Sequence, residues 1–492
     1  MFVPTQLIFF VSIKFLCSYL LQTATSGAVI IYFRGIVKSL PCPIAFTRGR
    51  GILNLWYYVL GGISTSNKYR DPIHGFIEVS DLENKIIDSR PFQRLRNIKQ
   101  LAMTYMVFHG AEHTRFGHSL GVMHLVTKAF SAAVDNGKDA YQFSEEKKKW
   151  YTQILRLIAL THDIGHAPFS HASESVFPDG LEHEDFTEKI IKETNIAEYI
   201  TQIGAEFREK LGPQYDITPD LICDIYLGRN PGERSEFTFL KSFMDSELDC
   251  DKMDYLLRDS VFCGVNYGRY DIERLISSLT IYVQDGCPRL AISDGGVQVF
   301  EEFVLARYFM FIQVYFHRTR RYFDIMFYRA LKDVLPDGKY PNSTNDYLKW
   351  DDTRVVQLMQ EKEDQSEACY NIVNRVIYPR VYHTKTHPDA GDKREFRLIK
   401  RELFRKFGED NFIEDVSADK MPHKIPTKTE VTDERAIVII DKSTGKCSTI
   451  SENSHIIGSL TDKIDIERLY VKPSLKTEVL AAIQEIYADI QK

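Results

Sequence analysis

The stretch of residues 155–183 constrains this chain more than any other part of the sequence. It contains the adjacent pair His162 and Asp163, and apolar residues precede this pair at helical spacing: Trp150, Ile154, Leu157, Ile158 and Thr161. The spacing predicts an amphipathic helix that carries the pair at its inner end. Buried imidazoles and carboxylates are costly unless they are paired or bind a metal. This ligand set suits Mn, Fe, Zn or Ni and, through oxygen, Mg.

Two other predicted helices supply further candidate ligands. His118 opens a helical pattern and lies at the start of its core-facing stripe. Asp251, Tyr255 and Asp259 recur at i, i+4 and i+8, so they share one helical face. A single His–Asp dipeptide is a weak signal for metal binding. The company of His118 and Asp251 is what favours a divalent cation.

A His, a His–Asp pair and an Asp on separate helices resemble the HD superfamily of metal-dependent phosphohydrolases. Longer motifs resemble one branch of it, the deoxynucleotide triphosphohydrolases. These motifs are DPIHG at 71–75, IDSRPFQRLRNIKQL at 87–101, FHGAEHTRFGHSLG at 108–121 and GVNYGRYDIERL at 264–275. The resemblance covers residues 67–330 strongly and the remainder of the chain weakly.

The resemblance implies a mainly α architecture, an HD-domain helical fold with a small α/β C-terminal lobe. We expect an N-terminal extension over residues 1–66, which the family does not match, and an HD-type metal phosphohydrolase domain over 67–330. A helical connector and the mixed α/β lobe would occupy 331–492. Within it, residues 336–345 are rich in turn-forming residues, and the β-branched segments 436–440 and 466–471 are predicted strands.

The resemblance also implies a reaction, the hydrolysis of a dNTP to a deoxynucleoside and intact triphosphate by attack at the α-phosphorus. The positions that match the family's metal ligands are His118, His162, Asp163 and Asp251. His171 matches the general acid, and the matching active-site positions around it are His166, Glu174 and His183. The positions that match substrate contacts are Gln100, Leu101, Arg115, Lys252, Tyr255 and Asp259.

Elementary chemistry is compatible with these roles. Two histidines and two aspartates around one divalent ion leave open positions for water or a phosphate oxygen. Such an ion polarises the phosphoryl group and lowers the pKa of bound water. Glu174 follows His171 by three residues, so its carboxylate can orient the imidazole and raise its pKa.

Regulation is a further implication of the resemblance, because the family binds guanine nucleotides or dNTPs between subunits and assembles a homotetramer. Asp88, Gln93 and Arg96 match one activator site, and Asp271 and Arg274 match a second. Ordinary surface or helix-end ion pairing is the alternative role for these residues. The chain departs from the family pattern at Arg70, Gly117, Glu174 and Met253, which leaves the choice of activator open.

Composition sets broader limits. With 492 residues, 44% of them hydrophobic, the chain can bury a large core. A net charge of -6 argues against a general nucleic-acid-binding surface, so no obligate nucleic-acid partner is expected. The eight cysteines form no CxxC pair, which is typical of reduced, buried thiols in an intracellular protein. We therefore expect a cytoplasmic location.

Residues 1–66 have several readings. The apolar run at 7–21 is interrupted by Lys14 and is short for a spanning helix. The alternatives are an irregular extension, which we favour, a tilted membrane anchor, or a signal peptide without a basic n-region. Membrane association is therefore not expected.

Two later segments also have competing readings. The run at 301–328 is aromatic-rich, and we expect its aromatic side chains to be core rather than a base-stacking platform; these include Phe309, Phe311, Tyr315 and Phe316. The basic run at 393–406 is predicted to be a solvated helix face, with contact to a phosphate as the alternative.

Two classes of function compete with dNTP hydrolysis. One is another HD-fold phosphohydrolase, such as a nucleotidase or phosphodiesterase. The other is a nucleotide-sensing or nucleic-acid-binding protein with vestigial catalysis. All readings share one structural expectation, which is that His118, His162, Asp163 and Asp251 meet around a single cation.

Overall fold

The computed structural model describes residues 67–490, apart from 179, 230–235, 421–422, 424, 426–429, 434–435 and 461. The readings of the N-terminal extension concern residues 1–66, which lie outside the described residues. Among the described residues, no helix combines the length and the apolarity needed to cross a membrane.

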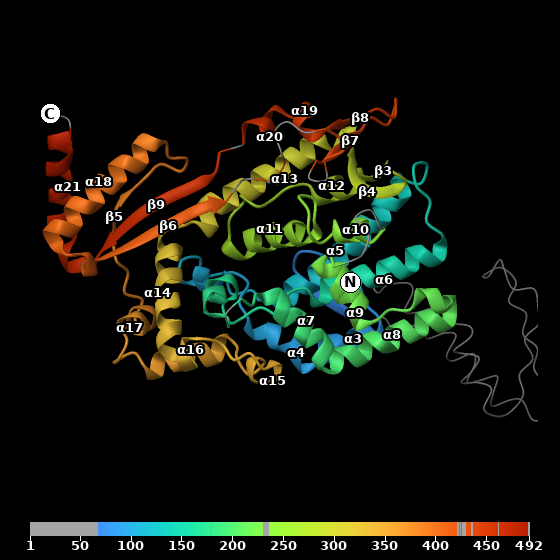
Figure 1. The fold of residues 1–492 in the computed structure, drawn as a ribbon, viewed down its shortest axis with the longest axis horizontal. Coiled ribbons are helices and arrows are strands. Elements are labelled where there is room, and N and C mark those ends of the chain that lie inside the picture. Colours follow the sequence, from blue (N-terminus) through green and yellow to red (C-terminus); the bar gives the residue numbers. More distant parts are fainter. Residues whose placement is uncertain are drawn as a thin grey trace, which may run out of the picture. The chain divides into compact units, whose positions relative to one another are not determined.

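The predicted mainly helical fold is confirmed (Figure 1). Its helices up to residue 334 are α3 (Asp81–Asp88), α4 (Arg90–Gln93), α5 (Arg115–Asn136), α6 (Glu145–Thr161), α7 (His183–Glu193), α8 (Asn195–Leu211), α9 (Pro219–Leu227), α10 (Glu236–Lys241), α11 (Cys250–Cys263), α12 (Ile272–Ser278), α13 (Val297–Met310) and α14 (Arg318–Val334). The later helices are α15 (Thr344–Tyr347), α16 (Asp352–Glu361), α17 (Glu367–Val373), α18 (Ala390–Phe407), α19 (Ile450–Asn453), α20 (His455–Ser459) and α21 (Lys476–Ile490).

Helix α5 is the centre of the HD region, because it packs against α6, α11 and α12. Local sequence sets where its neighbours α6 and α11 begin and where α11 ends. Ser144 caps α6 by accepting a hydrogen bond from the Lys147 N–H, and Asp249 caps α11 by accepting one from the Lys252 N–H. Gly264 ends α11 in the left-handed conformation, with φ of 69°. The sequence therefore places caps at the starts of α6 and α11 and at the end of α11.

Gly165 allows the loop after α6 to approach α7 closely. A Cβ atom built on Gly165 would lie 2.1 Å from the backbone oxygen of His183 and 2.4 Å from the backbone nitrogen of Thr187. The Gly165 N–H instead donates a hydrogen bond to Thr187 Oγ1 at 3.1 Å. The loop that carries His162, Asp163 and His166, here named the HD loop (residues 162–169), is thus packed directly onto the first turns of α7.

Two β-hairpins lie within the helical region and were not predicted. Strands β1 (Asn67–Asp71) and β2 (Gly75–Val79) pair antiparallel, and so do β3 (Leu279–Gln284) and β4 (Cys287–Ser293). The first hairpin turns through Asp71, whose Oδ1 accepts hydrogen bonds from the N–H groups of Ile73 and His74, both at 2.9 Å. This turn places the His74 side chain beside α11.

The two strands predicted near the C-terminus both form, but they belong to different sheets. Strand β7 (Val438–Ile440) pairs parallel with β4 and antiparallel with β8 (Cys447–Thr449), which extends the second hairpin to a four-stranded sheet. Strand β9 (Ile464–Val471) lies between β5 (Arg380–His383) and β6 (Phe412–Lys420). This three-stranded sheet and helices α18 and α21 enclose a separate small core that includes Phe396, Leu403, Leu469 and Val479.

The aromatic run is helical and mostly inside, with one correction. Tyr315 and Phe316 are buried and Phe311 is half-buried, but Phe309 is 43% exposed, so the expectation that it is core is wrong. Helix α13 passes into a π-helical turn, Phe311–Tyr315, before α14 begins.

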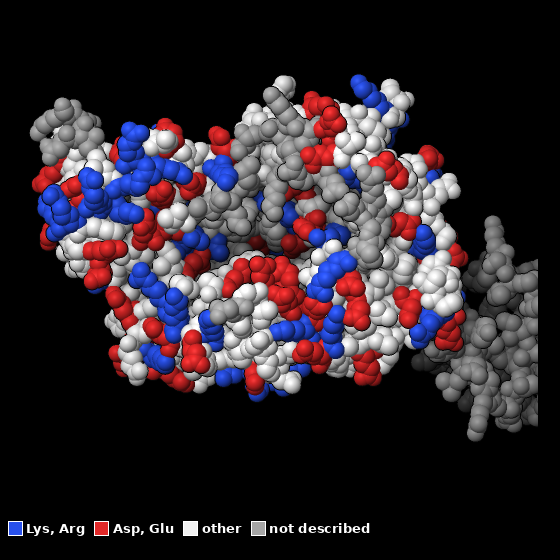
Figure 2. All heavy atoms as spheres, in the orientation of Figure 1, with Lys and Arg blue, Asp and Glu red and all other residues white. Residues whose placement is uncertain are grey.

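The basic run forms α18, and Figure 2 shows Lys and Arg side chains gathered over this helix. Lys393, Lys400 and Lys406 form ion pairs with Asp465, Glu414 and Glu485. The predicted solvated helix face is the arrangement that these pairs support. Cys223, Cys250, Cys263 and Cys369 are buried thiols that form no disulfide.

Candidate active site

Helices α5, α6 and α11 bring the four predicted metal ligands together. His118 Nε2 lies 2.8 Å from Asp251 Oδ1 and 3.6 Å from Asp163 Oδ2. His162 Nε2 lies 3.4 Å from Asp163 Oδ1 and 3.7 Å from Asp251 Oδ1. His118 is fully buried, whereas the Asp251 side chain is 35% exposed. The cluster is therefore closed on the helix side and open beside Asp251.

His162 gives the sharpest test of whether these residues fit a metal ion. Its Nδ1 bonds the backbone oxygen of Ala159 at 2.7 Å, which leaves Nε2 for another partner. Within the described part of the chain, this buried Nε2 has no hydrogen-bond partner, although it faces Asp163 and Asp251. Because a buried polar atom without a partner is costly, a cation at this point satisfies it. The donor set fits a divalent ion, whose identity the geometry leaves open.

The charges of the cluster favour the same conclusion. Burial acts to lower the pKa of His118, but hydrogen bonds to Asp251 and Asp254 raise it to about 10. Burial acts to raise the pKa of Asp251, but the hydrogen bond to His118 and the nearby charges of His118 and His162 hold it below its usual range. The carboxylates thus stay ionised and attract positive charge. A divalent ion would take the place of the protons on the imidazoles.

Behind His118 lies Asp254, an acid for which no role was predicted. Asp254 Oδ2 accepts a hydrogen bond from His118 Nδ1 at 2.8 Å, and its Oδ1 lies 2.6 Å from His74 Nε2. The fully buried Arg258 bonds both oxygens of Asp254 and also Asp71 Oδ2, at 2.8 Å. A carboxylate on Nδ1 keeps the other ring nitrogen, Nε2, free to ligate a metal. Asp71 and His74 belong to the DPIHG motif, and Asp254 and Arg258 lie on the same helix as Asp251. These positions were the available signal.

A second cluster of imidazoles and a carboxylate adjoins the first. Glu174 Oε1 lies 2.6 Å from His171 Nδ1 and 3.1 Å from His183 Nδ1. The His166 and His183 rings stack at 4.0 Å, and the His166 and His171 rings meet edge to face at 4.9 Å. The structure therefore brings together all four residues that were predicted to act in catalysis.

The protonation states in this second cluster differ. Burial lowers the pKa of His166, and the nearby charges of Arg115 and His183 lower it further. Burial acts to raise the pKa of Glu174, but hydrogen bonds to His171 and His183 hold it below its usual range. His166 is therefore neutral and Glu174 ionised near pH 7. The His171 side chain, which contacts this carboxylate, is 65% exposed.

Asp163 joins the two clusters. Its Oδ1 lies 3.2 Å from His166 Nε2, and its Oδ2 accepts a hydrogen bond from Arg115 Nη1 at 2.5 Å. Arg115 also donates from Nε to Ser170 Oγ at 2.6 Å. Arg115 was predicted to contact substrate phosphate, and here its buried guanidinium bonds Asp163. Contact between this guanidinium and a substrate phosphate stays a prediction.

The other predicted substrate residues surround the clusters to different degrees. Gln100 and Leu101 are buried, and in the region that the structure describes Gln100 Oε1 has no hydrogen-bond partner. Lys252 donates to the Ser246 backbone oxygen at 2.9 Å and to Asp249. Asp259 is committed to internal bonds, with His113 Nε2 at 2.8 Å and the Tyr315 hydroxyl at 2.7 Å. Tyr255, on the same helix, is partly buried against Tyr315.

The predicted activator residues lie in two places outside the clusters. Arg96 Nε donates to Gln93 Oε1 at 2.8 Å, and its guanidinium covers the Phe116 ring at 3.5 Å. Asp88 accepts a hydrogen bond from Asn84 Nδ2 at 2.7 Å. Asp271 caps α12 by accepting from the N–H of Arg274 at 2.9 Å, and Arg274 Nη2 donates to the Gly295 oxygen at 2.6 Å. These local bonds are of the kind expected if the residues serve only in surface or helix-end pairing. Nucleotide binding by them stays a prediction.

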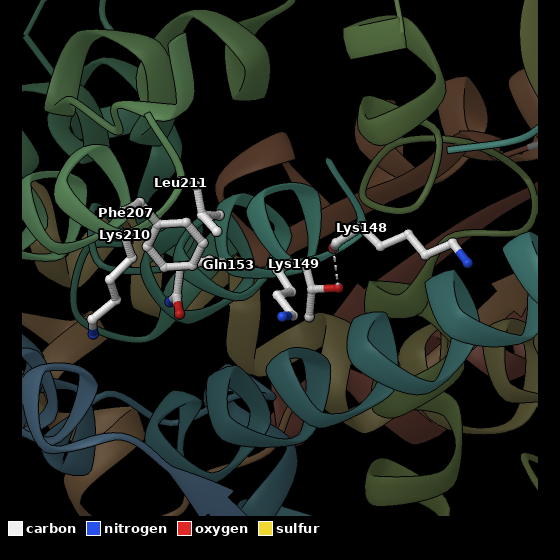
Figure 3. A pocket seen from close by; sticks show the side chains of 7 residues that line it. Lys148, Lys149, Gln153, Phe207, Lys210 and Leu211 are labelled. Carbon is white, nitrogen blue, oxygen red and sulfur yellow. Dashed lines mark hydrogen bonds between the residues drawn. The ribbon is translucent and has the colours of Figure 1, made fainter. Parts of the chain in front are cut away.

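A surface hollow of about 550 Å³ lies between α6 and α8 and is separate from the clusters (Figure 3). Its lining includes Lys148, Lys149, Phe207 and Lys210. Lys149 precedes His162 by thirteen residues along α6, which corresponds to roughly 20 Å of helix rise. This hollow therefore plays no part in the chemistry of the histidines and aspartates.

Comparisons with known proteins agree with this geometry. Residues 115–235 match the HD domain, and residues 270–487 match the HD associated region. The YwfO protein of Bacillus subtilis is 30% identical over 82% of this chain and 92% of its own length. The deoxynucleoside triphosphate triphosphohydrolase SAMHD1 of Gallus gallus is 28% identical over 75% of this chain and 62% of its own length.

A solved structure extends the likeness to three dimensions. A protein of Aquifex aeolicus is 30% identical, with a TM-score of 0.69 over 85% of this chain and 99% of its own. The chain therefore belongs to the HD-domain family of metal-dependent phosphohydrolases, in the group that resembles the deoxynucleoside triphosphate triphosphohydrolases.

Proposed function

We propose that this protein hydrolyses deoxynucleoside triphosphates to a deoxynucleoside and intact triphosphate, with a divalent ion held by His118, His162, Asp163 and Asp251. One observation carries the proposal. The His/Asp cluster, with its unpartnered His162 Nε2, adjoins the His171–Glu174–His183 cluster through the Asp163–His166 contact. A cation site and a proton donor lie side by side, as phosphate ester hydrolysis requires.

A divalent ion bound at such a cluster supplies Lewis-acid polarisation of a phosphoryl oxygen and lowers the pKa of water. His118 and His162 offer Nε2 atoms to it, because Asp254 and the Ala159 oxygen occupy their Nδ1 atoms. Asp163 and Asp251 offer carboxylate oxygens. The fixed tautomers of both histidines hold the ligand atoms ready before any ion arrives.

The second cluster is suited to protonating the leaving group. Glu174 bonds His171 Nδ1 at 2.6 Å, which orients the imidazole and leaves Nε2 as the atom from which a proton would be donated. The leaving deoxyribose oxygen would accept this proton. His183 shares the same Glu174 oxygen, and the neutral His166 ring stacks on His183, so both hold the carboxylate and the donor in place.

Gln100 supplies support for a sugar-bearing substrate. Its buried Oε1 lacks a partner among the described residues, and Leu101 beside it is apolar and buried. A ribose hydroxyl would satisfy the amide oxygen, while the leucine would pack on the sugar face. The phosphates would lie toward Arg115 and Lys252.

Regulation is the finer part of the proposal. A guanine nucleotide or dNTP would bind at Asp88, Gln93 and Arg96, and a second nucleotide at Asp271 and Arg274, with assembly of a homotetramer. The exposed side chains of Asp88 and Arg96 are free to face a ligand or another subunit. The SAMHD1 relatives of Gallus gallus and Dictyostelium discoideum bear the same enzyme name and support the nucleotide substrate.

Product analysis tests the proposal. Purified protein is incubated with each dNTP in Mg²⁺ or Mn²⁺, with and without GTP, and the products are separated by anion exchange. The expected products are deoxynucleoside and triphosphate in equal amounts. Orthophosphate or a nucleoside monophosphate would indicate the competing nucleotidase or phosphodiesterase reaction instead.

A matched pair of variants removes the ambiguity of contaminating activity. His162→Ala with Asp163→Ala should abolish triphosphate release. His455→Ala, at an exposed histidine of α20, should leave it unchanged. Equal activity of both variants would leave catalysis by this site without support, as a nucleotide-sensing protein would require.

A further inference from the structure

The residue that begins α16 bonds the backbone of two active-site segments. Asp352 is 6% exposed. Its Oδ1 accepts a hydrogen bond from the Phe169 N–H at 2.7 Å, and its Oδ2 accepts one from the Lys99 N–H at 2.8 Å. Phe169 lies two residues before His171, and Lys99 directly precedes Gln100. One carboxylate thus joins the segment of the proposed proton donor to the segment of the proposed sugar contact.

The two segments are also bonded to each other and to the metal ligands. Ser170 Oγ donates a hydrogen bond to the Lys99 backbone oxygen at 2.7 Å. Arg115 Nε donates to the same Ser170 Oγ at 2.6 Å, while its Nη1 bonds Asp163. A continuous path of hydrogen bonds therefore runs from Asp352 to the His/Asp cluster.

Residues 347–350, just before α16, contribute further hydrogen bonds to the same region. Arg94 donates to the backbone oxygens of Trp350 at 2.7 Å and His166 at 2.9 Å. The Tyr347 hydroxyl donates to the Gly165 oxygen at 2.6 Å. Tyr347 and Arg94 thus bond the carbonyls of Gly165 and His166 in the HD loop, and Asp352 bonds the amide of Phe169 near the end of this loop.

The backbone held by Asp352 has an uncommon conformation. Phe169 and Ser170 have φ angles of 58° and 55°, in the left-handed region that residues other than glycine adopt rarely. Two successive residues of this kind persist only where the surroundings hold them. The Phe169 N–H has the Asp352 carboxyl as its acceptor at this point, and this contact holds the turn that leads to His171.

We propose that Asp352 is a positioning residue for the active site. Its carboxylate holds the turn at Phe169 and the segment at Lys99 at a fixed separation, so that His171 and Gln100 face the same substrate. It touches no reacting atom. The effect on rate rests on the proposed function, whereas the two hydrogen bonds can be measured without any substrate.

Hydrogen–deuterium exchange measures the hydrogen bonds directly. Asp352→Asn keeps the side chain's shape but has only one acceptor oxygen, so one of the two N–H groups loses its partner. Asp351→Asn is the matched control, because Asp351 is the N-cap of α16 and Asn caps equally well. Its contact with residues 97–101 is to the side-chain amide of Asn97, at 3.1 Å, so no backbone N–H of that segment loses its partner. The expected result is faster exchange in peptides covering 97–101 or 167–173 in Asp352→Asn, with exchange as in wild type in Asp351→Asn.

Steady-state kinetics separates positioning from a general loss of structure. For Asp352→Asn we expect kcat to fall about 10- to 100-fold, because small displacements of reacting groups cost rates of this order, with a much smaller change in KM. Metal content per chain should equal that of wild type. Unchanged exchange at both segments, unchanged kcat, or a fall in kcat that parallels a loss of metal would each overturn the proposal.

Two provisions keep the test decisive. Should Asp352→Asn not fold, Asp352→Glu replaces it; this change keeps both acceptors but displaces them by one methylene, and faster exchange with lower kcat is again expected. Should wild type hydrolyse no nucleotide, the proposed function fails. The exchange measurement then decides by itself whether Asp352 holds the two segments.

Discussion

At the residue scale, Asp254 is the residue that holds His118 in the orientation proposed for metal binding. It accepts hydrogen bonds from His118, His74 and Arg258, and it is fully buried. Asp254→Asn removes the charge and replaces one acceptor oxygen with a donor, so Arg258 and an imidazole lose partners. Outer-shell changes of this kind typically weaken metal binding about 10- to 100-fold. We expect that loss in a Mn²⁺ titration followed by calorimetry.

Asp135→Asn is the control for this prediction, because Asp135 is exposed near the end of α5 and bonds only Ser131 in the described structure. It should bind Mn²⁺ as wild type does. An Asp254→Asn variant that also binds as wild type does would show that the His118 tautomer is held by something else.

The carboxyl of Asp352 makes stability depend on pH in a defined direction. Burial raises the pKa of Asp352 to about 7, from an ordinary value of about 3.9. The Asp352 carboxyl therefore binds its proton more tightly in the folded protein than in the unfolded chain. The stability that this proton confers is lost as the pH rises from about 4 through 7. Asp352→Asn has no such proton to lose.

Thermal unfolding of Asp352→Asn and wild type checks this direction. The difference in Tm should move in favour of the variant between about pH 5 and about pH 8. Asp351→Asn, measured in parallel, should show no such trend. A difference that stays constant, or moves in favour of wild type, would contradict a raised pKa at Asp352.

At the element scale, the loop after α6 depends on a glycine. A side chain at Gly165 would clash with backbone atoms of α7 at His183 and Thr187. Gly165→Ala must therefore push the HD loop and α7 apart, and overpacking of this kind costs about 1–3 kcal/mol. We expect a lower free energy of unfolding in urea and a loss of hydrolysis, since both clusters lie on these elements.

Gly458→Ala is the matched control, because a Cβ at Gly458 in α20 meets no atom within 4 Å. In a helix that change is neutral or stabilising by up to about 1 kcal/mol. Equal unfolding free energies for the two variants would mean that the approach of the loop to α7 is not tight.

The elements also show what the sequence could predict. His118 and His162 were found because each ends or begins an apolar helical stripe, which places it inside. Asp254 was not singled out, because only the packing of α11 on α5 shows that this acid, three positions after Asp251, meets the other ring nitrogen of His118. The first hairpin was missed since its strand NKYRD is charged and lacks apolar alternation.

At the scale of the whole molecule, long-range contacts were beyond sequence reasoning. Asp352 lies 253 residues from Lys99 and 183 from Phe169 along the chain, and no local pattern connects them. Likewise, β7 was predicted as a strand, but its parallel pairing with β4 depends on a hairpin more than 140 residues earlier. The sequence therefore predicted β7 as a strand but not the strand with which it pairs.

The same scale explains why the site is preformed. The HD loop is bonded by α7 through Thr187, by Arg94 and Asp352 through its backbone, and by Arg115 through Asp163. Segments on both sides of the HD region therefore hold the histidines and aspartates in place. Rigid support of this kind is what precise ligand and proton-donor geometry requires.

Anomalous diffraction from crystals soaked in Mn²⁺ tests the central claim most directly. The account predicts a strong peak within about 2.0–2.3 Å of His118 Nε2, His162 Nε2 and carboxylate oxygens of Asp163 and Asp251. The peak should be absent from crystals of the His162→Ala, Asp163→Ala variant. A wild-type crystal without density between these four side chains, or with its peak elsewhere, would contradict the account.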